Sequence, residues 1–167
     1  AYGLHQYWWS DGRRDPRAST TAALDYLQSL SNDFDQDWLI ALAAYNTGSR
    51  NIRRALRRKG VQIEEADFWK LPLNAETSAH VPRLLALASV IAKPEAFSIE
   101  LAELSNSEPL SYVDIGRQIE LEQVASLTNL ELGCIQTLNP GYLRWATHPE
   151  FPQQIAVPRD RRTLLEK

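Results

Sequence analysis

Apolar residues recur every three or four positions through the first half of the chain, which is the period of amphipathic helices. A first helix starts at Asp15-Pro16, because aspartate suits an N-cap and proline suits the first helical position. Its apolar face comprises Ala23, Tyr26, Leu27 and Leu30. Asp35 or Asp37 caps a second helix. The residues of this helix that are predicted to face inward are Trp38, Leu39, Leu42 and Ala43.

Residues 43–52 predict the end of a buried helix, a polar turn and the start of a third helix. Gly48 supplies the positive backbone angle that a helix stop often needs, and Ser49 offers an N-cap. Tyr45 and Asn46 are left at the mouth of the turn. Two interpretations stay open: Asn46 satisfies loose backbone groups at a helix corner, or both side chains face a ligand.

A fourth helix begins after Asn74, a residue that suits its N-cap. Pro82 falls inside the helical pattern, so a kink or a break into two helices is expected there. Residues 84–91 are almost entirely apolar, which predicts a buried helix. Before this helix, Phe68 and Trp69 are expected to anchor a short amphipathic segment.

The pattern changes after Pro94, and residues 94–111 have the composition of a linker. The elements predicted beyond it are a short strand within residues 112–119, helices at 120–129 and 132–138, and a strand at 154–158. Residues 112–158 are therefore predicted to form a compact module, followed by a charged, frayed tail at residues 159–167. The predicted fold is mainly α, with a helical lobe over residues 1–93 and this small module after it.

Charge suggests two units with different surfaces. The chain has a net charge of −3, yet residues 1–93 hold 12 Lys and Arg against 10 Asp and Glu, whereas residues 94–167 hold 6 against 11. The third helix, residues 51–59, is strongly basic, which fits either a nucleic-acid contact or a solvated helix face. Because the chain as a whole is acidic, no nucleic-acid partner is predicted.

Composition also limits cofactor and membrane chemistry. The single cysteine, Cys134, excludes an internal disulfide and a cysteine-rich metal site, and neither a metal nor another cofactor is predicted. No apolar run approaches the ~20 residues of a membrane helix, and the first residues lack the pattern of a signal peptide. The chain opens without methionine on an aromatic-rich phrase, as expected of a fragment or a processed chain.

Three ordered motifs resemble one family. Residues 43–48, AAYNTG, are similar to the AYNxG motif of soluble-lytic-transglycosylase-type domains, which share the goose-type lysozyme fold. Residues 2–27, with YGL, WWSDGRRD and ST, and residues 76–82, ETSAHVP, resemble the membrane-bound lytic murein transglycosylase D branch of that family. This resemblance covers residues 1–93 and implies a truncated lysozyme-like lobe.

The family cleaves the β-1,4 bond between N-acetylmuramic acid and N-acetylglucosamine of peptidoglycan, as a lyase that forms a 1,6-anhydro ring. One glutamic acid acts first as general acid and then as base. In the family this glutamate belongs to an ES phrase that precedes YGL, whereas this chain begins at Ala1-Tyr2-Gly3-Leu4. The resemblance therefore implies that the general acid lies upstream, that no catalytic residue is present here, and that the chain alone is inactive.

The site residues that the resemblance implies all bind substrate. They are Tyr45, Asn46, Thr47, Glu76 and His80. Asn46 is expected to present its amide to the sugar N-acetyl group or to backbone at the scissile subsite. His80 stands where the family usually has tyrosine, and it either hydrogen-bonds a carboxyl group or is a satisfied histidine on a helix face.

Residues 112–158 resemble LysM, a module that binds N-acetylglucosamine chains, through Asn139-Pro140 and residues 155–158. The usual Gly-Asp-Thr is replaced by Gly116-Arg117-Gln118. The resemblance therefore implies a degenerate LysM-like module, which either binds glycan or packs as a structural cap.

The family implies peptidoglycan glycan strands as the partner, and a periplasmic or outer-membrane-associated location in the bacterial envelope, with the parent protein anchored in the outer membrane. Two other functions stay open: a non-catalytic peptidoglycan-binding or regulatory module, and a lysozyme-like hydrolase. A lobe without its first helices is expected to expose apolar surface around Trp8, Trp9 and residues 84–91, and to self-associate through this face.

Overall fold

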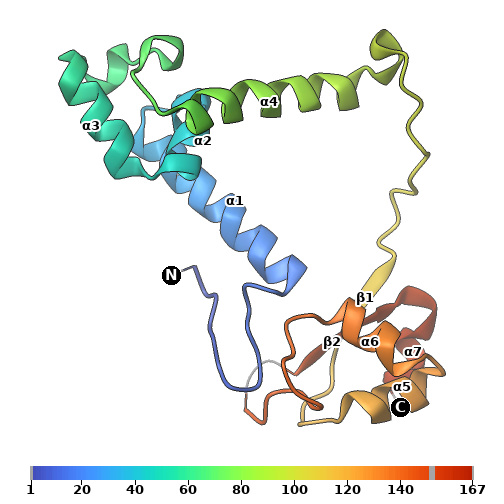
Figure 1. The fold of residues 1–167 in the computed structure, drawn as a ribbon. Helices are drawn as coiled ribbons and strands as arrows, with labels where there is room; N and C mark the ends of the chain where they lie inside the picture. The colour runs from blue at the N-terminus through green and yellow to red at the C-terminus, as the bar shows by residue number, and fades with distance from the viewer. Residues whose placement is uncertain (1, 151–152, 167) are drawn as a thin grey trace. The chain divides into compact units, whose positions relative to one another are not determined.

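The computed structural model describes residues 2–150 and 153–166. Helices dominate the described chain, and its strands form a small two-stranded sheet (Figure 1), so the prediction of a mainly α fold is confirmed. The chain divides into two compact units, residues 1–22 with 104–167 and residues 23–103. We refer to these as the terminal unit and the central unit. Among the described helices, none is both long and apolar enough to cross a bilayer.

The helices begin and end at residues whose chemistry suits those positions. They are α1 (Pro16–Asp33), α2 (Trp38–Thr47), α3 (Ser49–Lys59) and α4 (Ala75–Ala92), followed by 3₁₀ turns and the shorter helices described below. Asp15 caps α1 by accepting from the backbone N–H of Ala18 at 2.9 Å. Asp37 is the residue that caps α2. Gly60 ends α3 in the left-handed conformation.

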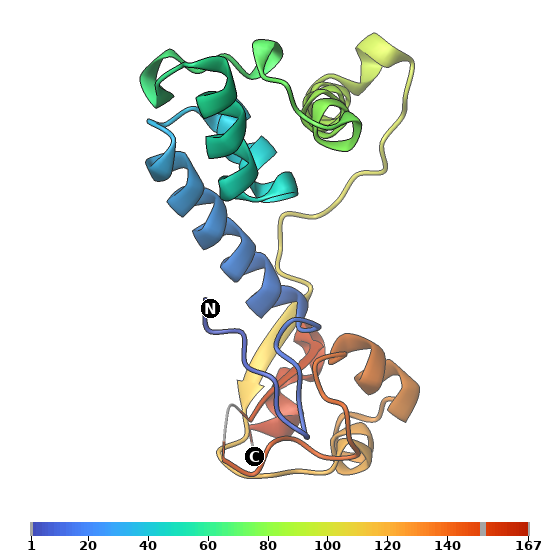
Figure 2. The same ribbon diagram turned by 60° about the vertical axis from the view of Figure 1, so that its left-hand side comes forward.

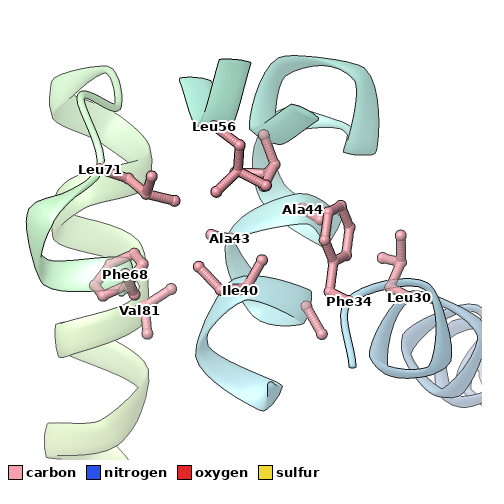
Figure 3. Close-up of a cluster of buried hydrophobic side chains, with 11 residues drawn as sticks. Leu30, Phe34, Ile40, Ala43, Ala44, Leu56, Phe68, Leu71 and Val81 are labelled. Carbon is pink, nitrogen blue, oxygen red and sulfur yellow. The ribbon is translucent and has the colours of Figure 1, made fainter. Parts of the chain in front are cut away.

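The core of the central unit surrounds α2. Ile40, Ala43 and Ala44 on this helix are fully buried, and Figure 3 shows α2 in the middle of the cluster. The other buried members are Ala41, which also lies on α2, and seven residues of the neighbouring elements, Leu30, Phe34, Ile52, Leu56, Phe68, Leu71 and Val81. Because alanines occupy much of α2, neighbouring helices approach it closely. The C-terminal end of α2 is therefore held firmly, and with it the turn that follows.

The structure contradicts the predicted break at Pro82 and one other prediction for α4. The helix is continuous from Ala75 to Ala92, with Pro82 inside it. Pro82 has no N–H to donate to the carbonyl of Ser78, so α4 continues with one backbone hydrogen bond fewer at this point. Residues 84–91 are not a buried helix either, since Leu87 is 60% exposed and Ile91 66% exposed. Within α4, the fully buried residues are Thr77 and Val81, both in its first half.

Three smaller predictions in this unit are also wrong. Trp38 begins α2 and is exposed rather than inward-facing. Trp69 is exposed beside the buried Phe68, because consecutive residues of the 3₁₀ turn Phe68–Lys70 point in different directions. Ser49 is the first residue of α3, and its N-cap is Gly48 without a side-chain hydrogen bond.

The terminal unit contains the predicted strand–helix–helix–strand order (Figure 1). Strand β1 (Leu110–Asp114) pairs antiparallel with β2 (Gln154–Pro158), with α5 (Leu121–Thr128) and α6 (Leu132–Leu138) between them in the chain. Residues 118–119 lie outside β1, because Gly116 at φ +67° turns the chain. The described part of the predicted frayed tail is helical instead, since residues 159–161 form a 3₁₀ turn and α7 (Arg162–Leu165) places Leu165 against the core.

A hairpin at residues 5–12 packs on the loop between α6 and β2 within the terminal unit (Figure 2). Asp11 N–H donates to the carbonyl of Gly141 at 2.8 Å, and Leu143 N–H donates to the carbonyl of Trp9 at 2.8 Å. A Cβ atom at Gly141 would lie 3.3 Å from Cβ of Asp15, so this close approach favours glycine. The Trp8-Trp9 phrase is therefore held by the loop that follows Asn139-Pro140.

Candidate functional site

The turn after α2 is the centre of the candidate site. Thr47 ends α2, and Gly48, with φ +91° and ψ 137°, leads directly into α3. The Gly48 N–H donates to the carbonyl of Ala44 at 2.8 Å, which closes the last turn of α2. This backbone conformation is open to glycine and strained for other residues. The turn therefore projects Asn46 and Thr47 from the end of a buried helix.

Asn46 connects this turn to the first turn of α4. Its Oδ1 accepts a hydrogen bond from Thr77 Oγ1 at 2.8 Å, and its Nδ2 donates to Glu76 Oε1 at 3.4 Å. Thr77 is fully buried, Asn46 is half-buried and Glu76 is exposed. The three side chains thus lead from the core to the surface, and the outermost pair is an amide beside a carboxylate.

Thr47 is held by two further amides. Asn74 Nδ2 donates to Thr47 Oγ1 at 3.3 Å, and Asn51 Nδ2 donates to the Thr47 carbonyl at 2.7 Å. Asn74 also caps α4 as predicted, because its Oδ1 accepts from the backbone N–H of Thr77 at 2.7 Å. One asparagine therefore links the start of α4 to the turn.

Tyr45 and His80 lie at the edges of this arrangement. Tyr45 is exposed, and its ring lies 5.7 Å from the ring of Tyr26 on α1. His80 is half-buried on α4, one helical turn after Glu76. Among the described residues, the hydrogen bonds that join the turn to α4 involve Asn46 and Thr47 but not His80.

Sequence reasoning missed Thr77 as a member of the site. Its position four residues before the buried Val81 on the same helix face was a signal for burial. A threonine with a buried hydroxyl needs a hydrogen-bond partner, and Asn46 is that partner. Within the part of the chain that the structure describes, no group of three or more His, Cys, Asp and Glu residues is arranged to hold a metal ion.

A second feature, in the terminal unit, is a cluster of three tryptophans. The ring centroids of Trp8 and Trp9 are 4.8 Å apart, and Trp145 lies 5.3 Å from Trp9 and 6.0 Å from Trp8, all edge to face. Arg144 places its guanidinium 4.2 Å from the centroid of Trp8. Trp8 is 57% exposed and Trp145 60% exposed, so the cluster is a rigid aromatic surface and not a core.

A cavity of about 400 Å³ opens beside this cluster. Its polar lining comes from three exposed side chains at the start of α5, Gln118, Glu120 and Gln123, and its aromatic lining from Trp9 and Trp145. Gln118 Nε2 donates to the carbonyl of Thr147 at 2.9 Å, which fixes that amide against the loop. Indole faces next to amides and a carboxylate can stack on a sugar ring while hydrogen-bonding its hydroxyl groups.

The hairpin that carries Trp8 and Trp9 is itself stabilised by an ion pair. The Arg13 guanidinium donates to both carboxylate oxygens of Asp11, the shortest contact being 2.8 Å. These hydrogen bonds, assisted by the backbone N–H of Arg13 and by Gln6, hold the pKa of the Asp11 carboxyl well below its usual range. In the neighbouring loop, burial raises the pKa of Tyr142, and the charges of Asp15 and Asp114 raise it further.

Comparison with known families gives two matches. Residues 1–68 match the transglycosylase SLT domain, and residues 109–167 match the LysM-like domain of lytic transglycosylase MltD. The first range includes the Trp8-Trp9 phrase and the turn at Tyr45-Asn46. The second includes the loop that carries Trp145.

Two curated proteins are similar over nearly all of this chain. The "Membrane-bound lytic murein transglycosylase D" of Escherichia coli (strain K12) is 35% identical over 166 residues, which cover 99% of this chain and 37% of that protein. The protein of the same name from Escherichia coli O6:H1 gives the same identity and coverage. The chain therefore spans 37% of the length of these curated relatives.

Proposed function

We propose that this chain is part of a peptidoglycan lytic transglycosylase, because residues 1–68 match the transglycosylase SLT domain and residues 109–167 match the LysM-like domain of lytic transglycosylase MltD. The contact between Asn46 and Glu76 carries the proposal, because it joins the AYNTG turn to the ETSAHVP phrase at one exposed position. In this proposal Asn46 and Glu76 bind the glycan strand, and Tyr45, Thr47 and His80 border them.

The proposed reaction breaks the bond between C1 of N-acetylmuramic acid and the bridging oxygen. A carboxyl group gives its proton to that oxygen, the 6-hydroxyl oxygen of the muramic acid closes onto C1, and its proton passes to the carboxylate. The product is a 1,6-anhydromuramic acid end. Asn46 suits recognition of the N-acetyl group, because an amide both donates and accepts hydrogen bonds.

We assign the general acid to no glutamate of these 167 residues. A carboxyl group that delivers a proton near neutral pH needs a desolvated setting, whereas Glu64, Glu65 and Glu76 are exposed. The chain by itself is therefore proposed to bind glycan without cleaving it. Its proposed organisation is a partial catalytic domain over residues 1–93, a linker at 94–111 and a LysM-like module at 112–158, working in the bacterial cell envelope.

A second candidate function, a peptidoglycan-binding module, is favoured by the tryptophan cluster. Trp9 and Trp145 border a cavity whose polar side chains are two glutamines and a glutamate. Exposed indoles next to such groups match the chemistry of a sugar ring, which has apolar C–H faces and a polar edge. In this second function, the terminal unit binds the glycan strand that the transglycosylase cleaves.

Incubation of the 167-residue chain with purified sacculi tests both proposals. We expect the protein to pellet with the sacculi and to release no soluble muropeptides. Asn46→Ala and Glu76→Gln should each lower the bound fraction, whereas Glu64→Gln, a matched change on the surface of the same unit, should not. Trp145→Ala should lower it only if the second function also holds.

Each other outcome has a defined meaning in this experiment. Anhydromuropeptides in the supernatant would refute the assignment of no general acid to this chain. New reducing ends would indicate lysozyme-like hydrolysis. If the wild-type chain stays in the supernatant, neither binding proposal stands.

We also propose that the chain self-associates through the exposed apolar face of α4. Leu84, Leu87 and Ile91 lie on this face at helical spacing, and all are exposed. Size-exclusion chromatography with light scattering should show a mass that rises with concentration, and Leu87→Glu combined with Ile91→Glu should abolish the rise. A constant monomer mass for the wild type would contradict the proposal.

A further inference from the structure

The hydroxyl of Thr77 makes a hydrogen bond that is unusual for a threonine on a helix. Serine and threonine side chains on helices commonly donate to the carbonyl three or four residues earlier. Examples in the described part of the chain, at 2.7–3.0 Å, are the hydroxyls of Ser89, Ser126, Thr128 and Thr137. Thr77 instead donates to Oδ1 of Asn46 at 2.8 Å, 31 residues away in the chain.

The position of Thr77 explains this difference. It is the third residue of α4, so the residue four positions earlier, Leu73, precedes the N-cap Asn74 and lies outside the helix. The backbone N–H of Thr77 is held by Asn74 Oδ1 at 2.7 Å. A β-branched side chain has few rotamers on a helix, and Thr77 is also fully buried. Its hydroxyl oxygen therefore occupies a fixed point next to the turn.

This fixed hydroxyl and Glu76 together determine how the Asn46 amide is oriented. A hydroxyl can donate or accept, so Thr77 alone would allow either face of the amide. Glu76 Oε1 accepts from Nδ2 at 3.4 Å, so Nδ2 is the atom that faces Glu76. Oδ1 then faces Thr77. Glu76 thus selects which amide atom faces outward, and Thr77, whose contact is short and buried where that of Glu76 is long and exposed, holds the amide in place.

We infer that Thr77 is a positioning residue, which holds the Asn46 amide with its N–H groups toward the surface for a sugar N-acetyl or hydroxyl oxygen. Among the described residues, Glu76 is the acceptor for Nδ2, which carries two hydrogens, so one hydrogen remains for a ligand. The functional half of this inference rests on the proposed glycan-binding role of Asn46. The structural half, the orientation of the amide, does not.

Nuclear magnetic resonance on the 15N-labelled chain tests the structural half. Thr77→Val keeps the shape of the side chain and removes the hydroxyl that holds Oδ1, so the Asn46 side-chain amide should become mobile and its 15N order parameter should fall clearly below the wild-type value. Thr77→Ser should keep the order parameter close to that of the wild type. Thr128→Val is the matched control, because Thr128 is equally buried but donates to carbonyls of its own helix, in the other unit. It should leave the Asn46 signals unchanged.

A reciprocal measurement covers the case in which Thr77→Val does not fold. In the wild type the Thr77 hydroxyl proton should exchange slowly enough to be observed, and Asn46→Ala should make it exchange too fast to observe. The inference is overturned if the Asn46 signals are unchanged in a folded Thr77→Val protein, or if the Thr77 hydroxyl proton is unaffected by Asn46→Ala.

Pelleting with sacculi tests the functional half. Thr77→Val should lower the apparent affinity about as much as Asn46→Ala, and Thr77→Ser should restore it. If Asn46→Ala itself leaves binding unchanged, the glycan-binding role of Asn46 fails, while the order parameter of the Asn46 amide still decides whether Thr77 positions it. If Asn46→Ala weakens binding and Thr77→Val does not, the positioning role is overturned.

Discussion

Asn139 is the residue whose loss should damage the terminal unit most clearly. Its Nδ2 donates to the carbonyls of Ile135 and Ala156 at 2.8 and 2.9 Å, and its Oδ1 accepts from the Ala156 N–H at 2.7 Å. One amide thus ties the end of α6 to strand β2, and all the groups involved are buried. The Asn139-Pro140 phrase that marked the module in the sequence therefore has a structural task.

Asn139→Ala removes all three hydrogen bonds. Each contributes about 1 kcal/mol net, so the terminal unit should lose about 3 kcal/mol, and more if the freed groups of Ala156 find no water. Urea unfolding gives the total change, and backbone hydrogen exchange localises it: protection should fall at residues 155–157 and stay unchanged at residues 40–44. Gln136→Ala, an exposed amide on the same helix, is the control. A loss below about 1 kcal/mol, or an equal loss in the control, would refute this reasoning.

Asn139→Asp adds a test by pH. The substituted carboxylate would keep the acceptor for the Ala156 N–H but would place an oxygen against two carbonyl oxygens. The folded state therefore favours the protonated carboxyl group, and its pKa is raised above the unfolded value of about 3.9. A raised folded pKa means that stability is greatest at low pH and declines as pH rises. This variant should thus be more stable near pH 4 than near pH 7, and the opposite trend would contradict the hydrogen-bond assignment.

Three further predictions concern single features. Arg13 holds the pKa of Asp11 below its usual range, so the unfolded chain binds a proton at Asp11 more readily than the folded chain does. The free energy of unfolding therefore falls as pH drops below about 4. Asp11→Asn should flatten this decline in thermal melts between pH 5 and pH 2. Asp37→Ala removes the cap of α2 and should cost about 1 kcal/mol in urea unfolding. Gly141→Ala brings a Cβ within 3.3 Å of Asp15 and should lower the melting temperature, whereas Gly133→Ala, which meets nothing within 4 Å inside α6, should not.

Helix boundaries could be predicted from the sequence because they depend on local chemistry. Asp15 and Asn74 act within one turn of their own positions, and the structure confirms both as N-caps. Which helix face is covered depends on distant parts of the chain, so the exposure of residues 84–91 could not be read from their apolar pattern. An apolar segment specifies that a surface favours burial, but not that another element is there to bury it.

In the candidate site, too, the sequence predicted what depends on local motifs and missed what depends on contacts between distant residues. The resemblance pointed to Asn46 and Glu76 as separate members of two motifs, and the structure joins them by a hydrogen bond. Thr77 was missed because its role depends on an acceptor 31 residues away. Likewise, nothing local in Trp145 indicates that Trp8 and Trp9 pack against it.

The hairpin at residues 5–12 has a consequence for the order of folding. Asp11 and Gly141, joined by a backbone hydrogen bond, are 130 residues apart in the chain. During synthesis, the helices of residues 23–103 have left the ribosome and can pack while the hairpin still lacks its partner loop. Pairing at such long range closes a large loop and is slow. The indoles of Trp8 and Trp9 therefore stay available to chaperones or to other nascent chains until translation has passed residue 145.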